Sequence, residues 1–214
     1  MDKCFYEETK LRECLTTDYL KQVAARFHFP VDEFGGIEDA ARRMAERMEG
    51  QEGFWYQFFD NTGSAGRQGD DFPDAYLPCM EVVMSLGAGV DELQEEYIQK
   101  GLLFESYIIE VLGSDLLIKG YELFNDWVAA NSKWHVAGYL FFGSVEALPL
   151  ERIRSVLKRL RADSVTCNAG YCLQPKKSVI FLAELTQDAD VTCRGICAGC
   201  NRKNCINAVQ SPFS

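Results

Sequence analysis

The feature that most constrains this chain is a group of four cysteines near its C-terminal end. They lie within thirteen residues, separated by three, two and four residues in turn: Cys193, Cys197, Cys200 and Cys205. Four thiolates must come within a few ångströms of one another to hold a 4Fe-4S cluster, and glycines between them allow the tight turns this requires. The spacing therefore predicts a metal site, with a 4Fe-4S cluster as the favoured occupant.

Zinc is the alternative metal for these thiolates. Structural zinc sites usually pair their ligands in two short knuckles separated by a longer connection, so four cysteines this close together are less typical of zinc. Arg194, Arg202 and Lys203 lie beside the cysteines. Their charge would partly offset the negative charge of a cluster and raise its reduction potential.

The first three cysteines of the group also match the triad of radical AdoMet enzymes, which bind a cluster with one open iron. Only fourteen residues follow Cys200, whereas that chemistry sits at the start of a β/α barrel. Cys205 also supplies a fourth ligand. We therefore expect a closed cluster with an electron-transfer or structural role.

The chain has nine cysteines, and its N-terminus lacks the apolar region of a secretory signal. We expect a cytoplasmic protein, where metal ligation or redox chemistry is a better reading than disulfides. Cys4, Cys14 and Cys79 are expected to be ordinary buried or half-exposed thiols. Cys167 and Cys172 form a separate pair, which could be alternative cluster ligands, a redox dithiol or ordinary thiols near a turn.

The charge balance narrows the range of partners. The chain carries 22 Lys and Arg against 32 Asp and Glu, a net charge of −10, with no basic block. This argues against nucleic acid and against an anionic membrane surface as partners. The apolar runs are interrupted well short of the ~20 residues that a membrane-spanning helix needs, so we expect no membrane segment.

The pattern of apolar residues predicts a mixture of helices and strands. Helical spacing occurs at 17–27, 37–49, 91–101, 102–132 and 150–161, and strand-like runs at 54–59, 80–85, 137–142, 164–167 and 178–185. Asp91 is expected to cap its helix. Irregular alternation of this kind indicates an α+β fold rather than a regular βαβ wind. The polar stretch 61–74 suggests a boundary, with an N-terminal helical segment at 1–74.

Common catalytic motifs are missing from the sequence. It has two histidines, His28 and His135, and we expect both to be structural. It lacks a Ser-His-Asp set, a Walker loop and a strand-linked G-x-G-x-x-G, so hydrolase, NTPase and dinucleotide-binding functions have no support.

Four segments in order resemble the activation domain of cobalamin-dependent methionine synthase. They are Val82-Val-Met-Ser-Leu-Gly-Ala-Gly-Val-Asp91, residues 101–117, Leu148-Pro-Leu-Glu-Arg-Ile153 and Tyr171-Cys-Leu-Gln-Pro-Lys-Lys-Ser-Val179. The resemblance covers roughly residues 75–186, which leaves 187–214 as a cysteine-rich segment. Stand-alone relatives of that domain, some with a C-terminal cysteine cluster, occur in anaerobic bacteria.

The resemblance implies an α+β fold with a curved antiparallel sheet and flanking helices. In the parent family this domain binds AdoMet and remethylates an oxidised cobalamin after one-electron reduction. The stretch Phe142–Pro149 lacks the Arg and the Tyr of the family's ligand loop. No AdoMet ligand is therefore assigned to a residue of this chain.

The sequence leads us to expect an iron-sulfur accessory protein of corrinoid metabolism. It would dock on a corrinoid-binding protein or methyltransferase and pass it one electron, with Tyr171, Pro175 and Lys177 shaping the surface near the cluster. One alternative is a methyl-transfer protein that binds AdoMet through diverged contacts. Another is a non-enzymatic module that zinc or a closed cluster staples together.

Overall fold

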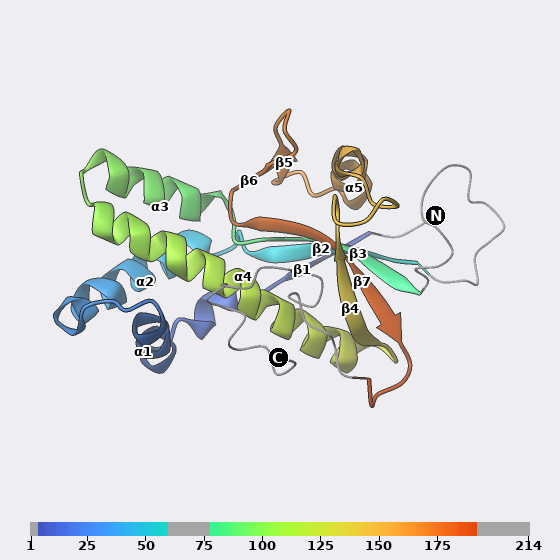
Figure 1. The fold of residues 1–214 in the computed structure, drawn as a ribbon, viewed down its shortest axis with the longest axis horizontal. Helices are drawn as coiled ribbons and strands as arrows, with labels where there is room; N and C mark the ends of the chain where they lie inside the picture. Colours follow the sequence, from blue (N-terminus) through green and yellow to red (C-terminus); the bar gives the residue numbers. More distant parts are fainter. Residues whose placement is uncertain (1–3, 60–77, 192–214) are drawn as a thin grey trace.

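The computed structural model describes residues 4–59 and 78–191. These residues form a five-stranded antiparallel sheet and five α-helices, with a separate two-stranded hairpin (Figure 1). The α+β class expected from the sequence is confirmed. The helices are α1 (Thr17–Arg26), α2 (Phe34–Met48), α3 (Ala88–Gln99), α4 (Leu103–Asn131) and α5 (Ile153–Leu160), with 3-10 turns η1 (Leu11–Cys14), η2 (Val31–Glu33) and η5 (Leu150–Arg152).

The sheet has the order β1-β2-β3-β7-β4, and each neighbouring pair is antiparallel. The hairpin pairs β5 with β6. The strands are β1 (Phe5–Glu8), β2 (Gly53–Phe59), β3 (Cys79–Ser85), β4 (His135–Phe141), β5 (Thr166–Cys167), β6 (Leu173–Gln174) and β7 (Ser178–Thr186). The central strand β3 is buried along its whole length, which is why it reads as a continuous apolar run apart from Glu81 and Ser85.

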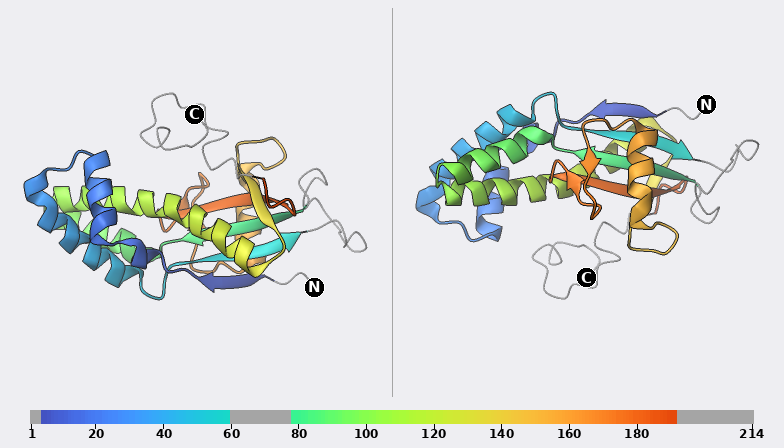
Figure 2. Two further views of the ribbon diagram at one scale, coloured as in Figure 1. Left: turned by 90° about the horizontal axis from the view of Figure 1, so that it is seen from below. Right: turned by 90° about the horizontal axis from the view of Figure 1, so that it is seen from above.

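Helices cover both faces of this sheet (Figure 2). The C-terminal half of α4 lies on one face, where the ring of Phe124 packs 5.3 Å from Phe54 and 5.5 Å from Phe181. Helix α5 lies on the other face, where Leu157 shares a core with Val83. Successive side chains of a strand point to opposite faces, so β3 contributes alternately to the two cores.

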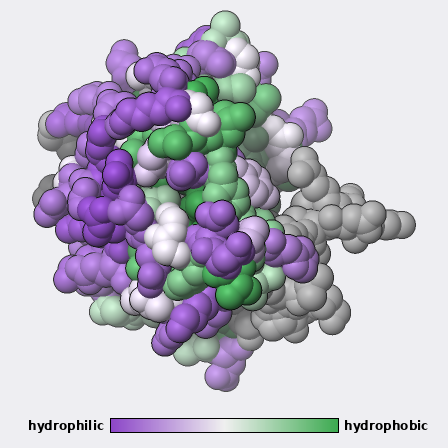
Figure 3. All heavy atoms as spheres, turned by 90° about the vertical axis from the view of Figure 1, so that its left-hand side faces the viewer, coloured by the Kyte–Doolittle hydropathy of each residue, from purple (hydrophilic) through white to green (hydrophobic). Residues whose placement is uncertain are grey.

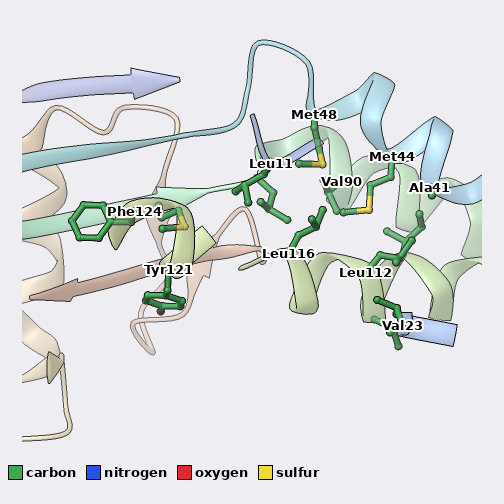
Figure 4. Close-up of a cluster of buried hydrophobic side chains, with 14 of the residues drawn as sticks. Leu11, Val23, Ala41, Met44, Met48, Val90, Leu112, Leu116, Tyr121 and Phe124 are labelled. Carbon is green, nitrogen blue, oxygen red and sulfur yellow. The ribbon is translucent and has the colours of Figure 1, made fainter. Parts of the chain in front are cut away.

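Helices α1, α2 and α3 pack with the first half of α4 beside the sheet, and their core continues into the core beneath α4. Figure 4 shows Met44, Val90 and Leu112 meeting between α2, α3 and α4. Strands β2 and β3 pair although they lie on either side of the boundary expected near residue 74. The described residues on both sides of that boundary therefore share one core.

Helix α4 runs for 29 residues and contains two glycines, Gly113 and Gly120. Both glycines allow another side chain to lie close to the helix backbone. A Cβ at Gly120 would lie 2.4 Å from the sulfur of Met84, and one at Gly113 would lie 3.0 Å from the side chain of Lys177. The missing side chains let α4 pack tightly against β3 and the start of β7.

Strand β1 was not anticipated, because Phe5-Tyr-Glu-Glu8 lacks the alternation of a half-buried strand and all four residues are exposed. It exists because its backbone pairs with β2, with Tyr6 opposite Trp55. In the part of the chain that the structure describes, no helix is long and apolar enough to cross a membrane.

Candidate functional site

The four cysteines of the expected metal site lie outside the described residues. The described chain ends at Val191, five residues after the end of β7. Cys193, Cys197, Cys200 and Cys205 therefore remain a prediction from the sequence.

Among residues 4–59 and 78–191, no group of three or more His, Cys, Asp or Glu side chains could hold a metal ion. The two histidines lie apart. His28 is an exposed residue beyond the end of α1 with a positive φ of 57°, and His135 is the half-buried first residue of β4.

The three early cysteines occupy separate positions, as the sequence predicted. Cys79 is buried at the start of β3, whereas Cys4 and Cys14 are half-buried. Burial raises the pKa of the Cys14 thiol, which keeps it in the unreactive protonated form.

Cys167 and Cys172 lie on the β5–β6 hairpin, in different environments. Cys167 stands opposite Leu173 in the pairing of β5 with β6, whereas Cys172 lies in the turn just before β6, where its carbonyl accepts the backbone N–H of Asn168 at 3.0 Å. Cys167 packs against the core beneath α5, while Cys172 is exposed. Asn168 closes the hairpin by accepting the backbone N–H groups of Gly170 and Cys172 at 2.8 and 3.0 Å. Both thiols are free in this structure.

Three of the four segments that carry the family resemblance meet in one place. The backbone N–H of Leu86 donates to the carbonyl of Lys177 at 2.9 Å. The hydroxyls of Ser85 and Ser178 lie 2.8 Å apart in the buried pairing of β3 with β7. Lys177 also contacts Glu110 and Ser114 in the first half of α4. The turn after β3, the start of β7 and this part of α4 therefore form one junction. The fourth segment, 148–153, lies at the start of α5 instead.

Lys177 is the centre of this junction rather than a surface residue. Its side chain is 7% exposed, and its Nζ contacts the carboxylate of Glu110 and the hydroxyl of Ser114, the latter at 3.0 Å. Burial alone would raise the pKa of the Glu110 carboxyl, but hydrogen bonds from Lys177 and Gln94 outweigh it, and the pKa is lowered. Lys177 is therefore committed to a structural ion pair.

The other two residues expected near the cluster are also tied into the fold. Pro175 is buried, and Tyr171 is half-buried with the guanidinium of Arg154 5.0 Å above its ring. The expected surface role therefore does not apply to Lys177 or Pro175.

Asp91 does not cap α3 as expected, because the helix begins three residues earlier, at Ala88, with Gly87 in the capping position. Asp91 instead lies in the first turn, where its Oδ2 accepts the backbone N–H of Lys176 at 2.7 Å. This bond fastens the β6–β7 turn to α3. The other oxygen, Oδ1, is buried without a hydrogen-bond partner among the described residues.

A pocket of about 340 Å³ opens beside this junction, where β3 turns into α3. It is lined by Tyr6, Gly50, Gln51, Trp55, Gly87, Ala88 and Ser164. The rings of Tyr6 and Trp55 pack 5.0 Å apart on one side. Gly87 has a φ of +88°, and a Cβ there would lie 2.4 Å from the Cβ of Gln51, so the turn is built for a glycine.

The polar side chains of the pocket lining are the hydroxyls of Tyr6 and Ser164, the amide of Gln51 and the indole of Trp55. Its lining contains no carboxylate, histidine or thiol among the described residues. Desolvation and nearby carboxylates, Glu8 and Glu52, raise the pKa of Tyr6, so its hydroxyl stays protonated near neutrality. The sequence did not point to this pocket, because its walls come from five separate parts of the chain.

The stretch 142–149, which lacks the family's AdoMet ligands, folds back on itself. Gly143 donates its N–H to the carbonyl of Leu148 at 2.6 Å, and Phe142 and Leu148 are buried beneath α5.

Comparison of the chain with protein-family models and with curated proteins finds no match.

Proposed function

We propose that this protein is an iron-sulfur electron-transfer protein of corrinoid metabolism. The observation that carries the proposal is the presence of four cysteines within thirteen residues: Cys193, Cys197, Cys200 and Cys205. They would hold a 4Fe-4S cluster, which supplies or accepts one electron at a time. In the proposed reaction the cobalt of a docked corrinoid protein gains this electron and passes from the +2 to the +1 state.

The described residues support the metal-binding part of the proposal. Residues 4–59 and 78–191 contain no competing group of metal ligands. The five other cysteines are free thiols, and two of them, Cys167 and Cys172, share the β5–β6 hairpin. The corrinoid part rests on the resemblance, and the meeting of three resembling segments at one junction supports it.

Anaerobic purification tests the cluster directly. We expect about four irons and four sulfides per chain, with visible absorption that bleaches on addition of dithionite. The Cys200→Ser variant should lose most of the iron, whereas Cys172→Ser, a matched exposed cysteine, should retain it. One zinc per chain in a colourless protein would contradict the proposal and favour a structural staple.

Electron delivery is tested by mixing dithionite-reduced protein, freed of excess dithionite, with a corrinoid protein in the cobalt(II) state. We expect the absorption of cobalt(I) to appear as the protein's visible absorption returns. If the reduced cluster does not reduce cobalt in any corrinoid protein supplied, the corrinoid function is wrong. The proposal of a metal site would not be affected by that result.

The pocket beside Gly87 favours a second candidate function, AdoMet binding. Its volume of about 340 Å³ falls in the range of small-ligand sites. It also includes Gly87 and Ala88, which belong to a resembling segment. Calorimetry with AdoMet should then show saturable binding that Trp55→Ala weakens and Trp127→Phe, a change on the opposite face of the sheet, leaves unchanged. No heat of binding at millimolar AdoMet would exclude this candidate.

A further inference from the structure

Exposed apolar side chains gather at the helical end of the molecule. Five of the nine large hydrophobic residues that stand exposed among the described residues lie there. They form what we call the helical-tip patch: Val31 (91% exposed), Leu103 (67%), Tyr107 (50%), Ile98 (44%) and Leu102 (38%). Figure 3 views this end of the molecule and shows an apolar region bordered by hydrophilic residues.

The members of the helical-tip patch come from neighbouring segments. Leu103 and Tyr107 are one turn apart on α4, Leu102 precedes this helix directly, and Ile98 lies in the last turn of α3. The ring of Tyr107 lies 5.7 Å from the buried ring of Phe29, which precedes Val31 by two residues. Residues from η2, α3 and α4 therefore form one surface.

The fold itself does not require these residues to be apolar. The inner faces of the same helices already supply the core, with Leu93 and Ile108 almost fully buried. Single exposed hydrophobic residues are common, but a contiguous exposed group rimmed by polar residues marks an interaction surface. The helical-tip patch is such a surface.

The rim of the patch carries negative charge. Asp32, Glu33 and Glu105 border it, and none of them forms an ion pair within residues 4–59 and 78–191. Lys100, the basic residue of the α3–α4 turn, is already bound to Glu96. Two copies of this chain would bring like charges together, and the protein carries a net charge of −10. An acidic rim instead favours a partner with Lys and Arg around an apolar face.

We propose that the helical-tip patch docks an amphipathic helix of another protein, with an apolar face bordered by Lys and Arg. A helix fits better than an added strand, because the sheet edges, β1 and β4, lie away from η2 and the α3–α4 turn. Anchors one turn apart on such a helix can pack over Leu103 and Tyr107. The proposal does not depend on the cysteine cluster or on corrinoid chemistry.

Two synthetic peptides of about 18 residues test the proposal, long enough for a helix of several turns. Both carry leucine on one face; one has lysine at the borders and the other glutamate. Fluorescence anisotropy with the full chain should show binding of the lysine peptide that weakens as salt is added. The glutamate peptide should bind at least about tenfold more weakly.

Matched variants locate the binding surface. Val31→Ser and Leu103→Ser, at the two most exposed positions of the patch, should each weaken binding of the lysine peptide about tenfold. Leu150→Ser, at a 41% exposed leucine on η5, should leave it unchanged. The pair Asp32→Asn and Glu33→Gln should reduce both affinity and salt dependence. Because Val31 is almost fully exposed, Val31→Ser should fold as the wild type does. A loss of binding in this variant would therefore not result from misfolding.

Four outcomes would overturn the proposal. Equal affinity for both peptides, or unchanged affinity in Val31→Ser and Leu103→Ser, would show that the patch does not recognise a basic helix. A dimer in sedimentation that Leu103→Ser dissociates would assign the patch to a second copy. Pelleting with neutral phosphatidylcholine vesicles in place of peptide binding would assign it to a lipid surface.

Discussion

Three carboxylates among residues 4–59 and 78–191 are buried and paired with an arginine. Glu52 pairs with Arg12, Glu81 with Arg159 and Asp115 with Arg26, each joining two elements of the fold. A buried ion pair adds little net stability, but removing one partner leaves an uncompensated charge in the core. These pairs therefore specify which surfaces meet rather than supply most of the stability.

The pair beneath α5 gives the first prediction. Glu81 is fully buried on β3, and the guanidinium of Arg159 contacts both of its carboxylate oxygens at 2.9 Å. Arg159→Met should lower the free energy of unfolding by about 3–5 kcal/mol, because the buried carboxylate of Glu81 loses the guanidinium that contacts both of its oxygens. Urea denaturation measures this loss. The double variant with Glu81→Met should recover most of it, and a loss under about 1 kcal/mol in the single variant would contradict the argument.

The Lys177–Glu110 pair predicts a pH dependence. The pKa of Glu110 is lowered in the folded protein from its ordinary value of 4.5. Because folding lowers this pKa, the ionised carboxylate stabilises the fold at pH values above its pKa in the unfolded chain. The stabilisation is lost as the pH falls through its pKa in the folded protein. Wild type should therefore be more stable than Glu110→Gln at pH 6, and the difference should shrink as the pH falls below about 4.5.

Urea denaturation between pH 6 and pH 3 measures this difference, with Glu151→Gln as the control. Glu151 is exposed on η5 and forms no ion pair within the described residues, so its variant should follow wild type throughout. A difference between wild type and Glu110→Gln that stays constant with pH would show that the ion pair is not its source.

At the scale of elements, α4 connects the helical end to the sheet, and its glycines decide how closely it approaches β3. Gly120→Ala should destabilise the protein by about 1–3 kcal/mol, because the new methyl group would collide with the buried side chain of Met84. Alanine favours a helix by about 1 kcal/mol over glycine, so propensity alone predicts the opposite sign. Thermal or urea unfolding distinguishes the two.

Gly36→Ala is the matched control, because the space around Gly36 in α2 is open and the nearest atom to a new Cβ lies 3.9 Å away. It should be neutral or slightly stabilising. Combining Gly120→Ala with Met84→Ala should cost less than the sum of the two single changes, since the smaller side chain removes the collision. Strict additivity would contradict the contact.

At the scale of the whole molecule, the buried residues of both cores in the described part of the chain lie between Leu11 and Leu185, before the cysteine segment begins. We therefore expect removal of the metal by an anaerobic chelator to bleach the protein while leaving its far-ultraviolet circular dichroism unchanged. The midpoint of urea unfolding should move only slightly. Loss of the helical signal on chelation would instead show that the metal staples the fold.

Much of the local structure could be predicted from the sequence, because apolar spacing reflects which side of an element is buried. The period of Leu20, Val23 and Ala24 identified α1, and the aromatic run from Phe54 identified β2. The start of α3 was missed by three residues, because Gly89 reads as part of a turn although it fits closely against Arg47 of α2. Such fits depend on a neighbour distant in sequence.

What the sequence by itself determined was the α+β class, most helices and strands, and a cysteine group dense enough to predict a metal site. These depend on local periodicity and on ligand spacing, and both are properties of residues that are close together in the sequence. Only the tertiary structure decided that Lys177 is buried against Glu110, that Cys167 packs against a core while Cys172 is exposed, and that a pocket and an apolar tip exist. Each of these depends on segments that meet through strand pairing and helix packing, which local sequence does not encode.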